Sequence, residues 1–208
     1  MASSYQPSWR EEERLWRAGY ARLVGVDEAG RGALAGPVVA AAVVLAFHDD
    51  YPYMDSKQLS SKKRQIYAED IKSQALYWNV SMQSAQAIDE GNIVKATVQA
   101  SSESLMAAGA DAVISDYLEL PSSSYVMPLV KADQRSYQVA AASILAKTAR
   151  DQYMLGLAAI YPEYGFERHK GYATAHHIKQ LFAHGPCDAH RKSFEPIKGM
   201  LAQTSIFS

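Results

Sequence analysis

Two adjacent carboxylates, Asp27 and Glu28, end a short apolar run that begins at Leu23. Glycines follow at once on both sides of a single guanidinium, that of Arg31. The three nearest are Gly30, Gly32 and Gly36. Carboxylate oxygens suit Mg²⁺, and two such ions can activate water and hold charge on the leaving oxygen of a phosphodiester. These residue types fit hydrolysis at a metal site, whereas a solvated acidic turn is the plainer alternative for an Asp-Glu pair alone.

Neighbouring residues of an ideal strand point to opposite faces, so Asp27 and Glu28 reach one point only if the backbone twists or bulges there. The glycines that follow allow such a bend. Two more aspartates, Asp116 and Asp133, also come just after short apolar strands. Strand ends on one edge of a sheet are where α/β proteins gather site residues. The pattern favours convergence of the three aspartates, although ordinary turn aspartates among 22 acidic residues would look the same.

A long helix is predicted from about Ser136 to Ile160, directly after Asp133. Four polar residues in it are separated by 7, 4 and 3 positions and therefore share one face. They are Ser136, Ser143, Lys147 and Arg150. These residues either contact the phosphates of a substrate near the acidic residues or simply form a solvated face of the helix.

Alternating strands and helices must position these groups. The predicted strands cover about residues 22–28, 37–46, 75–82, 111–115 and 125–131. The predicted helices cover about 8–17, 59–74, 85–90, 92–108, 136–160 and 174–183, with caps at Ser8, at Ser60 or Ser61, and at Thr174. The strand at 37–46 is apolar throughout, which is typical of a strand covered on both faces. The order predicts an α/β fold with a mixed central sheet flanked by helices.

Length and composition fit one domain over residues 1–208, with a helical C-terminal part at about 160–208 packed on it. The one cysteine, Cys187, excludes an internal disulfide and fits a reducing compartment. The N-terminus has no basic-then-apolar leader pattern. The longest uncharged run, near residues 34–47, is shorter than the roughly 20 residues that span a bilayer. We therefore expect a cytoplasmic protein with no membrane contact.

The net charge of −1 gives little sign of a nucleic-acid partner, but basic residues are unevenly distributed. Residues 147–198 hold eight Lys or Arg against five Asp or Glu, and five of the six histidines. Those histidines lack the coupled spacing of a zinc site, and Cys187 alone does not supply it. Thr174 caps a predicted helix whose free N–H groups could accept an anion.

Five blocks of the sequence occur in a recognisable order. They are Asp27 to Val43, Asp55-Ser56-Lys57, Ala141-Ala142-Ser143-Ile144, His169-Lys170-Gly171-Tyr172 and His190-Arg191-Lys192-Ser193-Phe194. Together they resemble the ribonuclease HII family, the type 2 ribonucleases H. The resemblance covers most of the chain, from about residue 22 to residue 194. It implies the ribonuclease H-like fold with a small C-terminal helical extension.

The resemblance also implies four catalytic carboxylates that bind the metal, Asp27, Glu28, Asp116 and Asp133. Mg²⁺ or Mn²⁺ would be the cofactor, with two ions per site. The chain departs from the family where Tyr117 follows Asp116 and where Ala132 precedes Asp133, since glycine is usual at both places. Neither change removes a ligand, but Tyr117 would be strained if its position needs a positive φ.

By the same resemblance, Gly30-Arg31-Gly32 would hold the 2′-OH of the ribonucleotide on the 5′ side of the RNA–DNA junction. Tyr172 would stack on the next sugar, a deoxyribose. Backbone can read the 2′-OH, the group that separates RNA from DNA, only if it comes close, which glycine permits. Further substrate-binding candidates are Lys57, Ser143, Lys147, Lys170 and Arg191. Each basic one could instead be ordinary surface charge, and Tyr172 could simply pack a loop.

We expect a monomeric endoribonuclease that cuts RNA paired with DNA, including 5′ to a single embedded ribonucleotide, leaving 3′-hydroxyl and 5′-phosphate ends. A replication clamp could contact the tail after Phe194, where Met200-Leu201 and Ile206-Phe207 are apolar. One alternative is a ribonuclease HIII-like enzyme, although that enzyme lacks the Gly-Arg-Gly loop and carries an N-terminal domain for which about twenty residues leave no room. Others are a catalytically silent duplex-binding protein and a different metal-dependent nuclease on this fold.

Overall fold

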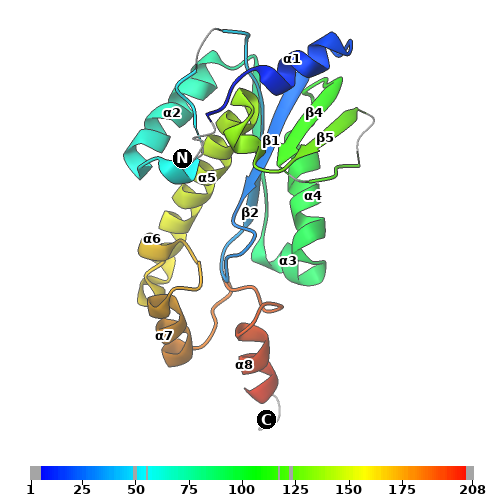
Figure 1. Cartoon of the computed structure of the whole chain (residues 1–208). Helices are drawn as coiled ribbons and strands as arrows, with labels where there is room; N and C mark the ends of the chain where they lie inside the picture. The colour runs from blue at the N-terminus through cyan, green and yellow to red at the C-terminus, as the bar shows by residue number, and fades with distance from the viewer. Residues whose placement is uncertain (1–5, 49–50, 55, 117, 122–123, 205–208) are drawn as a thin grey trace, which may run out of the picture.

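The computed structural model describes residues 6–48, 51–54, 56–116, 118–121 and 124–204. Its centre is a five-stranded sheet in the order β3-β2-β1-β4-β5 (Figure 1). The strands are β1 Leu23–Ala29, β2 Val38–Val44, β3 Tyr77–Gln83, β4 Ala112–Asp116 and β5 Tyr125–Leu129. β2 runs antiparallel to β1 and β3, whereas β1, β4 and β5 are parallel. The predicted mixed α/β sheet is confirmed.

Eight α-helices and three short 3₁₀ turns are found in the described part of the chain. The helices are α1 Arg10–Arg17, α2 Ser61–Gln74, α3 Ala85–Glu90, α4 Ile93–Ser104, α5 Tyr137–Ile160, α6 Phe166–His169, α7 Ala175–His184 and α8 Ile197–Thr204. The 3₁₀ turns are η1 Ser56–Gln58, η2 Ala132–Gln134 and η3 Pro162–Tyr164. None of the described helices is long and apolar enough to cross a membrane.

The central strands are buried because helices cover both faces of the sheet, with α5 on one side and α4 on the other (Figure 1). Alternate residues of β2 divide between them, since Ala41 and Val43 pack with α5 while Ala42 and Val44 pack on the α4 side. This is the period of two expected for a strand, and it explains the uninterrupted apolar run. At Gly25 the backbone of α5 is so near that a Cβ would lie 2.3 Å from Gln138 C.

Helix caps were predicted correctly at two positions and wrongly at one. The Ser60 and Thr174 hydroxyls accept bonds from the N–H groups of Lys63 and His177. Ser8 was predicted to cap the first helix, but Trp9 is its N-cap, without a side-chain bond. The ring of Trp9 is buried among aromatic residues instead, so tertiary packing overrides the local capping signal.

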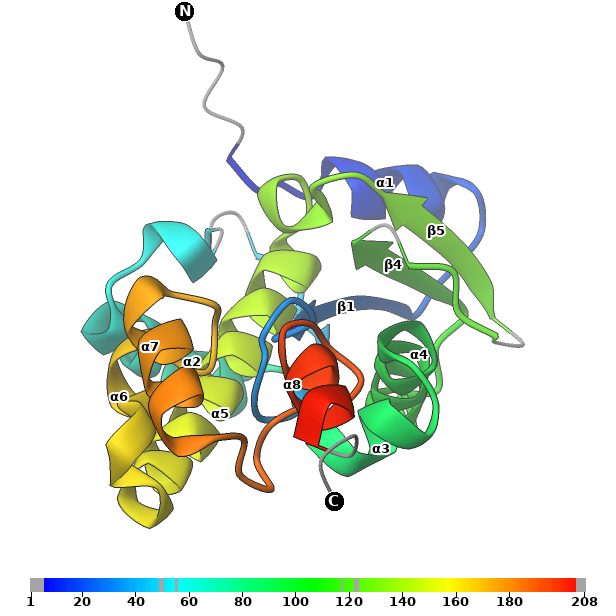
Figure 2. The same cartoon turned by 90° about the horizontal axis from the view of Figure 1, so that it is seen from below.

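The last helix, α8, was not predicted, and neither was α6. Ile197 of α8 is fully buried against Leu34 and Leu181, so a contact with α7 and with the segment after β1 anchors it (Figure 2). The C-terminal part also makes backbone bonds to that segment, from Leu34 N to Gly171 O and from Arg191 N to Leu34 O, both 2.8 Å. Residues distant in sequence thus fix the loop that follows β1.

Candidate active site

Three strand ends bring the acidic residues to one edge of the sheet. Asp27 lies in β1 and Asp116 ends β4, and the register Val26↔Ser115 makes these two aspartates the next neighbours along the parallel pair. Asp133 lies in η2, just after β5. The Asp116 carboxylate accepts a bond from Ala132 N at 3.1 Å, which ties the end of β4 to this turn.

Burial and mutual repulsion shape the charge at this edge. Asp27 is only 6% exposed, and burial raises its pKa well above the ordinary value. The carboxylates of Glu28, Asp116 and Asp133 raise it further, while a bond from the Ser143 hydroxyl lowers it. Burial also raises the pKa of Glu28. The protein therefore concentrates negative charge where water solvates it poorly.

Cations partly offset this charge. Arg31 Nη1 lies 3.1 Å from Glu28 Oε1 and opposes the rise in the pKa of Glu28. Lys57 Nζ lies 3.7 Å from Asp133 Oδ2. Neither cation pairs with Asp27, whose repulsion by its neighbours is what a bound divalent ion would relieve.

The donor set fits hard divalent ions, since all four groups offer carboxylate oxygens. In the ranges that the structure describes, no three acidic, histidine or cysteine side chains are already gathered closely enough to hold an ion by themselves. Mg²⁺ needs few protein ligands because it keeps waters and takes substrate phosphate oxygens. Asp27, Glu28, Asp116 and Asp133 are the residues that would hold it.

A cavity of about 420 Å³ opens beside the carboxylates. Its lining is Asp27, Glu28, Ala29, Gly30, Ser56, Lys57, Ser143, Lys147 and Tyr172. The Ser56 and Ser143 hydroxyls are 2.8 Å apart, and Lys147 Nζ lies 5.9 Å from the centre of the Tyr172 ring. Several predicted substrate-binding residues thus line the same cavity as two of the carboxylates, and the whole lining comes from four segments of the chain.

Arg191 was predicted to contact phosphate, and this prediction is wrong. Its side chain is fully buried and donates to the carbonyls of Gly30 at 2.7 Å, Arg31 at 2.8 Å and Gly36 at 3.0 Å. Burial and the nearby Arg150 charge lower its pKa to about 9, so it is still cationic at neutral pH. Inward-facing carbonyls of a buried loop need donors, and this guanidinium supplies three.

The predicted polar stripe on α5 also needs correction at its last member. Arg150 is fully buried rather than facing phosphates, and it donates to the carbonyls of Pro37, Ala35 and Lys170 at 3.0, 3.1 and 3.0 Å. Ser143 and Lys147 do line the cavity. Ser136 is buried and caps α5 through a bond from Val139 N at 3.1 Å. The buried guanidiniums of Arg150 and Arg191 thus bond the inward-facing carbonyls of residues 30–37, which we call the glycine loop.

Gly30 and Gly32 differ in whether the surrounding structure leaves room for a side chain. Gly30 has φ +95°, and a Cβ there would lie 2.0 Å from Arg150 Nε. Gly32 has no atom within 4 Å of such a Cβ. Packing therefore requires glycine at position 30 but not at position 32, which leaves the backbone at Gly32 open to a ligand.

A chain of buried histidines holds Tyr172, which sequence analysis did not predict. Cys187 N–H donates to His190 Nδ1 at 3.1 Å, the Nε2 atoms of His190 and His177 are 3.1 Å apart, and His177 Nδ1 lies 2.9 Å from Tyr172 O. Burial lowers the pKa of both histidines to about 4, so both are neutral and one tautomer of each satisfies all three bonds. The crowding of histidines between residues 169 and 190 was the available signal.

Other predicted contacts are only partly placed. The Lys170 ammonium bonds the Glu167 carbonyl and does not line the cavity. Lys192, which follows Arg191 in the last block of the resemblance, is exposed, and its backbone N–H bonds Asp89. Asp55 and Tyr117, whose φ was in question, lie outside the described residues.

A mixed sheet that carries carboxylates at its strand ends, beside a cavity, suits a metal-dependent nuclease. The model of the family described as Ribonuclease HII matches residues 24–197. A protein of Halalkalibacterium halodurans named Ribonuclease HII is 45% identical over 93% of this chain and 76% of its own length. One of Thermus thermophilus, with the same name, is 45% identical over 89% and 92%. The chain belongs to the ribonuclease HII family and is a metal-dependent ribonuclease H-type endonuclease.

Solved structures agree on the fold. The ribonuclease HII in the complex with PCNA from Archaeoglobus fulgidus has a TM-score of 0.72 at 25% identity, covering 84% of this chain and 96% of that one. Ribonuclease H2 of Pyrococcus horikoshii gives 0.75 at 23% identity, over 88% and 98%. Bst-RNase HIII, solved with Mn²⁺, gives 0.62 at 20%, over 88% and 70%.

Proposed function

We propose that this enzyme hydrolyses the RNA strand of RNA–DNA hybrids and cuts on the 5′ side of single ribonucleotides embedded in duplex DNA. The products carry 3′-hydroxyl and 5′-phosphate ends. The observation that carries the proposal is an open glycine backbone at Gly32, in the loop that directly follows Asp27 and Glu28 of β1.

The exposed position of the Gly32 backbone would allow the enzyme to select RNA over DNA. The carbonyls of Gly30 and Arg31 are taken by Arg191 on the inner side of the loop. The exposed side at Gly32 has no side chain in the way, so its peptide groups can meet a sugar hydroxyl directly. A 2′-OH that bonds there would hold its phosphodiester beside the carboxylates, and a deoxyribose would not.

Tyr172 would favour a deoxyribose, rather than a ribose, as the next sugar. Its ring is partly exposed on the cavity, and Arg150 Cζ lies 5.1 Å from the ring centre behind it. The histidine chain described above fixes its backbone. A ring held in this way packs well against a deoxyribose and penalises an added hydroxyl.

Two divalent ions, Mg²⁺ or Mn²⁺, would supply the activated water and the charge that the leaving oxygen needs. Asp27, Glu28, Asp116 and Asp133 would hold them, and Asp27 and Asp116 are neighbours on the paired strands β1 and β4. Lys57, Ser143 and Lys147 line the same cavity and are placed to orient the phosphates next to the cut.

A strand-specific cleavage assay tests the proposal. Duplexes of one sequence would carry no ribonucleotide, one, or a full RNA strand, and the 5′-labelled products would be mapped at single-nucleotide resolution. We expect cutting of the second and third duplexes with Mg²⁺ and none of the all-DNA control. Asp27→Asn controls for contaminating nucleases. Cutting of the long hybrid alone would indicate a ribonuclease HIII-type specificity, and no cutting would indicate a silent binding protein.

We further propose that the enzyme is a cytoplasmic monomer and that its C-terminal part contacts a replication clamp. The Archaeoglobus relative was solved in complex with PCNA. In this chain Leu201 on α8 is partly exposed at the end of the described residues, while Ile206 and Phe207 lie beyond them. Leu201→Ser combined with deletion of residues 205–208, which keeps the buried anchor Ile197, should abolish co-elution with a bacterial clamp and leave the mass that of a monomer.

The C-terminal part, about residues 160–208, is also proposed to fold with the sheet as one domain. Arg191 bonds three carbonyls of the loop after β1, and Ile197 is buried against Leu34. One cooperative unfolding transition, with limited proteolysis failing to release a stable 1–160 fragment, is the expected result.

A further inference from the structure

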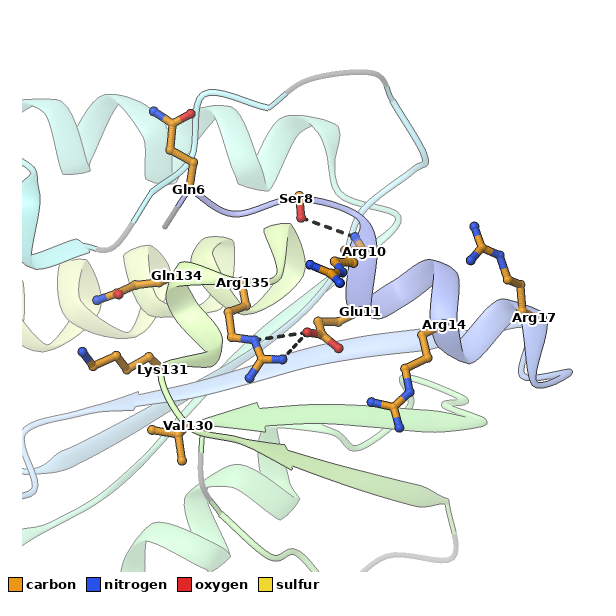
Figure 3. Close-up of a pocket in the computed structure, with 10 residues that line it drawn as sticks. All are labelled: Gln6, Ser8, Arg10, Glu11, Arg14, Arg17, Val130, Lys131, Gln134 and Arg135. Atoms are coloured by element: carbon orange, nitrogen blue, oxygen red, sulfur yellow. Dashed lines mark hydrogen bonds and ion pairs between the residues drawn. The ribbon is translucent and has the colours of Figure 1, made fainter. Parts of the chain in front are cut away.

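A second cavity, which we call the α1 pocket, lies between α1 and the turn that follows β5 (Figure 3). Its volume is about 1020 Å³. Its lining is Gln6, Ser8, Arg10, Glu11, Arg14, Arg17, Val130, Lys131, Gln134 and Arg135. Five of these side chains are cationic and one is acidic, in a protein whose net charge is −1. The pocket is therefore a local concentration of positive charge.

Three of the cations are uncompensated. Glu11 is engaged by Arg135, whose Nε lies 3.1 Å from Oε1, and Arg17 pairs with Glu13 at 2.9 Å. Across the described residues, no carboxylate lies within ion-pair distance of Arg10, Arg14 or Lys131, which are all exposed. Exposed cations without partners attract anions at long range.

The cations form a row. Arg10, Arg14 and Arg17 are separated by 4 and 3 positions, so their backbone positions follow one side of α1, while the Arg14 and Arg17 side chains extend in different directions from it (Figure 3). Seven residues of helix rise about 10 Å, a length along which one strand of B-form duplex presents about three phosphates. This match between the spacing of the cations and that of a nucleic-acid backbone favours a polyanion over a single small anion.

One end of the α1 pocket lies beside the proposed active site. Lys131 and Gln134 lie at one end of the pocket, on the turn that contains Asp133, and Arg14 and Arg17 lie toward the other end (Figure 3). The ion pair between Arg135 and Glu11 ties α1 to this turn. A strand that passes Asp133 can therefore continue along α1.

We propose that the α1 pocket binds consecutive phosphates of a substrate strand several nucleotides away from the cleaved bond. This extends the proposed function, on which it depends for the identity of the substrate. The contacts are to phosphate alone, so they raise affinity without selecting the sequence or the sugar. They also explain how a chain with a net charge of −1 holds a duplex.

The test is a triple variant, Arg10→Gln, Arg14→Gln and Lys131→Gln. A control carries the same change of charge on α2, α6 and α7, as Lys72→Gln, Arg168→Gln and Lys179→Gln. Binding to an all-DNA duplex and to a duplex with one ribonucleotide is measured in EDTA, where no cleavage occurs, over a range of salt concentrations. Flanks on either side of the ribonucleotide are shortened in two series.

We expect the pocket variant to bind the long duplex roughly tenfold more weakly at moderate salt, with the slope of log K against log salt smaller by about 2 to 3. The control should keep the wild-type slope. Shortening one flank, and not the other, should remove the difference between variant and wild type. Equal affinity and slope in pocket variant and control would overturn the proposal.

Two further outcomes are decisive. If inorganic phosphate raises the melting temperature of the wild type but not of the pocket variant, while duplex affinity is unchanged, the pocket binds a small anion and the proposal fails. If the wild type never cuts the embedded ribonucleotide, yet the pocket variant loses duplex affinity as described, the proposed function fails and the pocket assignment stands.

Discussion

The two halves of the active site are built on opposite principles. The glycine loop rests on Arg150 and Arg191, whose guanidiniums are buried, and each bonds three backbone carbonyls. The acidic edge holds Asp27 among three other carboxylates, with its pKa raised by burial and by their charges. The loop is complete without a ligand, whereas the acidic edge is electrostatically unfavourable until cations reach it. The glycine loop is thus held in place by the protein alone, whereas the acidic edge carries charge that bound cations would offset.

The most direct way to break this comparison is to remove one group from each half. Arg191→Met leaves three buried carbonyls without donors and should lower the free energy of unfolding by about 3–5 kcal/mol. Asp27→Asn removes a buried charge that is repelled by its neighbours, so stability should stay within about 1 kcal/mol of the wild type or rise. Urea unfolding in EDTA measures both. A larger loss from Asp27→Asn than from Arg191→Met would show that the two halves have been assigned the wrong way round.

Two glycines in the same loop sharpen the comparison. Gly30→Ala places a Cβ 2.0 Å from Arg150 Nε at a φ of +95° and should cost about 2–4 kcal/mol of stability. Gly32→Ala meets no atom within 4 Å and should change stability by less than about 0.5 kcal/mol. If the backbone at position 32 meets the 2′-OH, Gly32→Ala should still lower cleavage at an embedded ribonucleotide by roughly tenfold or more, equivalent to about 1.4 kcal/mol. Wild-type cleavage by a well-folded Gly32→Ala would contradict that reading of the loop.

A buried carboxylate outside both halves provides a third test. Glu12 on α1 is fully buried, its Oε1 accepts a bond from the Ser136 hydroxyl at 2.6 Å, and burial raises its pKa from 4.5 to about 7. The folded state therefore binds more protons than the unfolded state between these values, so this group stabilises the protein fully below pH 4.5 and loses that contribution as the pH rises to about 7.

Glu12→Gln cannot lose a proton. The difference in unfolding free energy between this variant and the wild type should therefore shift in favour of the variant by about 3 kcal/mol between pH 4.5 and pH 8. Denaturant melts of both proteins at four or five pH values measure this shift. A difference that does not change with pH would mean that Glu12 ionises in the folded protein at its ordinary pKa.

The smallest expected effect concerns the cation itself. If the four carboxylates bind the ion only in the folded chain, Mg²⁺ at ten times its dissociation constant should stabilise the protein by about 1.4 kcal/mol. Thermal unfolding with and without Mg²⁺, in the absence of nucleic acid, would show this as a rise of a few degrees. Asp27→Asn should lose the rise, whereas Gly32→Ala should keep it. Equal shifts in wild type and Asp27→Asn would place the ion elsewhere.

Local sequence predicted most of what depends on neighbours along the chain. The strand ends that carry Asp27 and Asp116, the caps at Ser60 and Thr174, and the long helix after Asp133 all follow from short patterns and are found within a few residues of the expected positions. The family resemblance supplied the roles of the four carboxylates, which spacing alone left open.

Charge placement was predicted less well. Arg150 and Arg191 read as surface or phosphate-binding residues, since arginine is usually exposed, yet both are buried under the loop. Nothing near them in sequence reveals this, because the carbonyls that they bond come from residues more than 100 positions away, apart from Lys170 O near Arg150. The same holds for α8, whose anchor Ile197 is buried against Leu34.

The sequence by itself determined the strands, the caps and the acidic and glycine residues that end β1, because hydrogen bonding and burial within a segment decide them. The tertiary structure decided which charges face solvent and which serve the interior. That choice depends on which distant carbonyls and carboxylates surround a side chain once the chain has folded, and only the packed molecule brings those partners together.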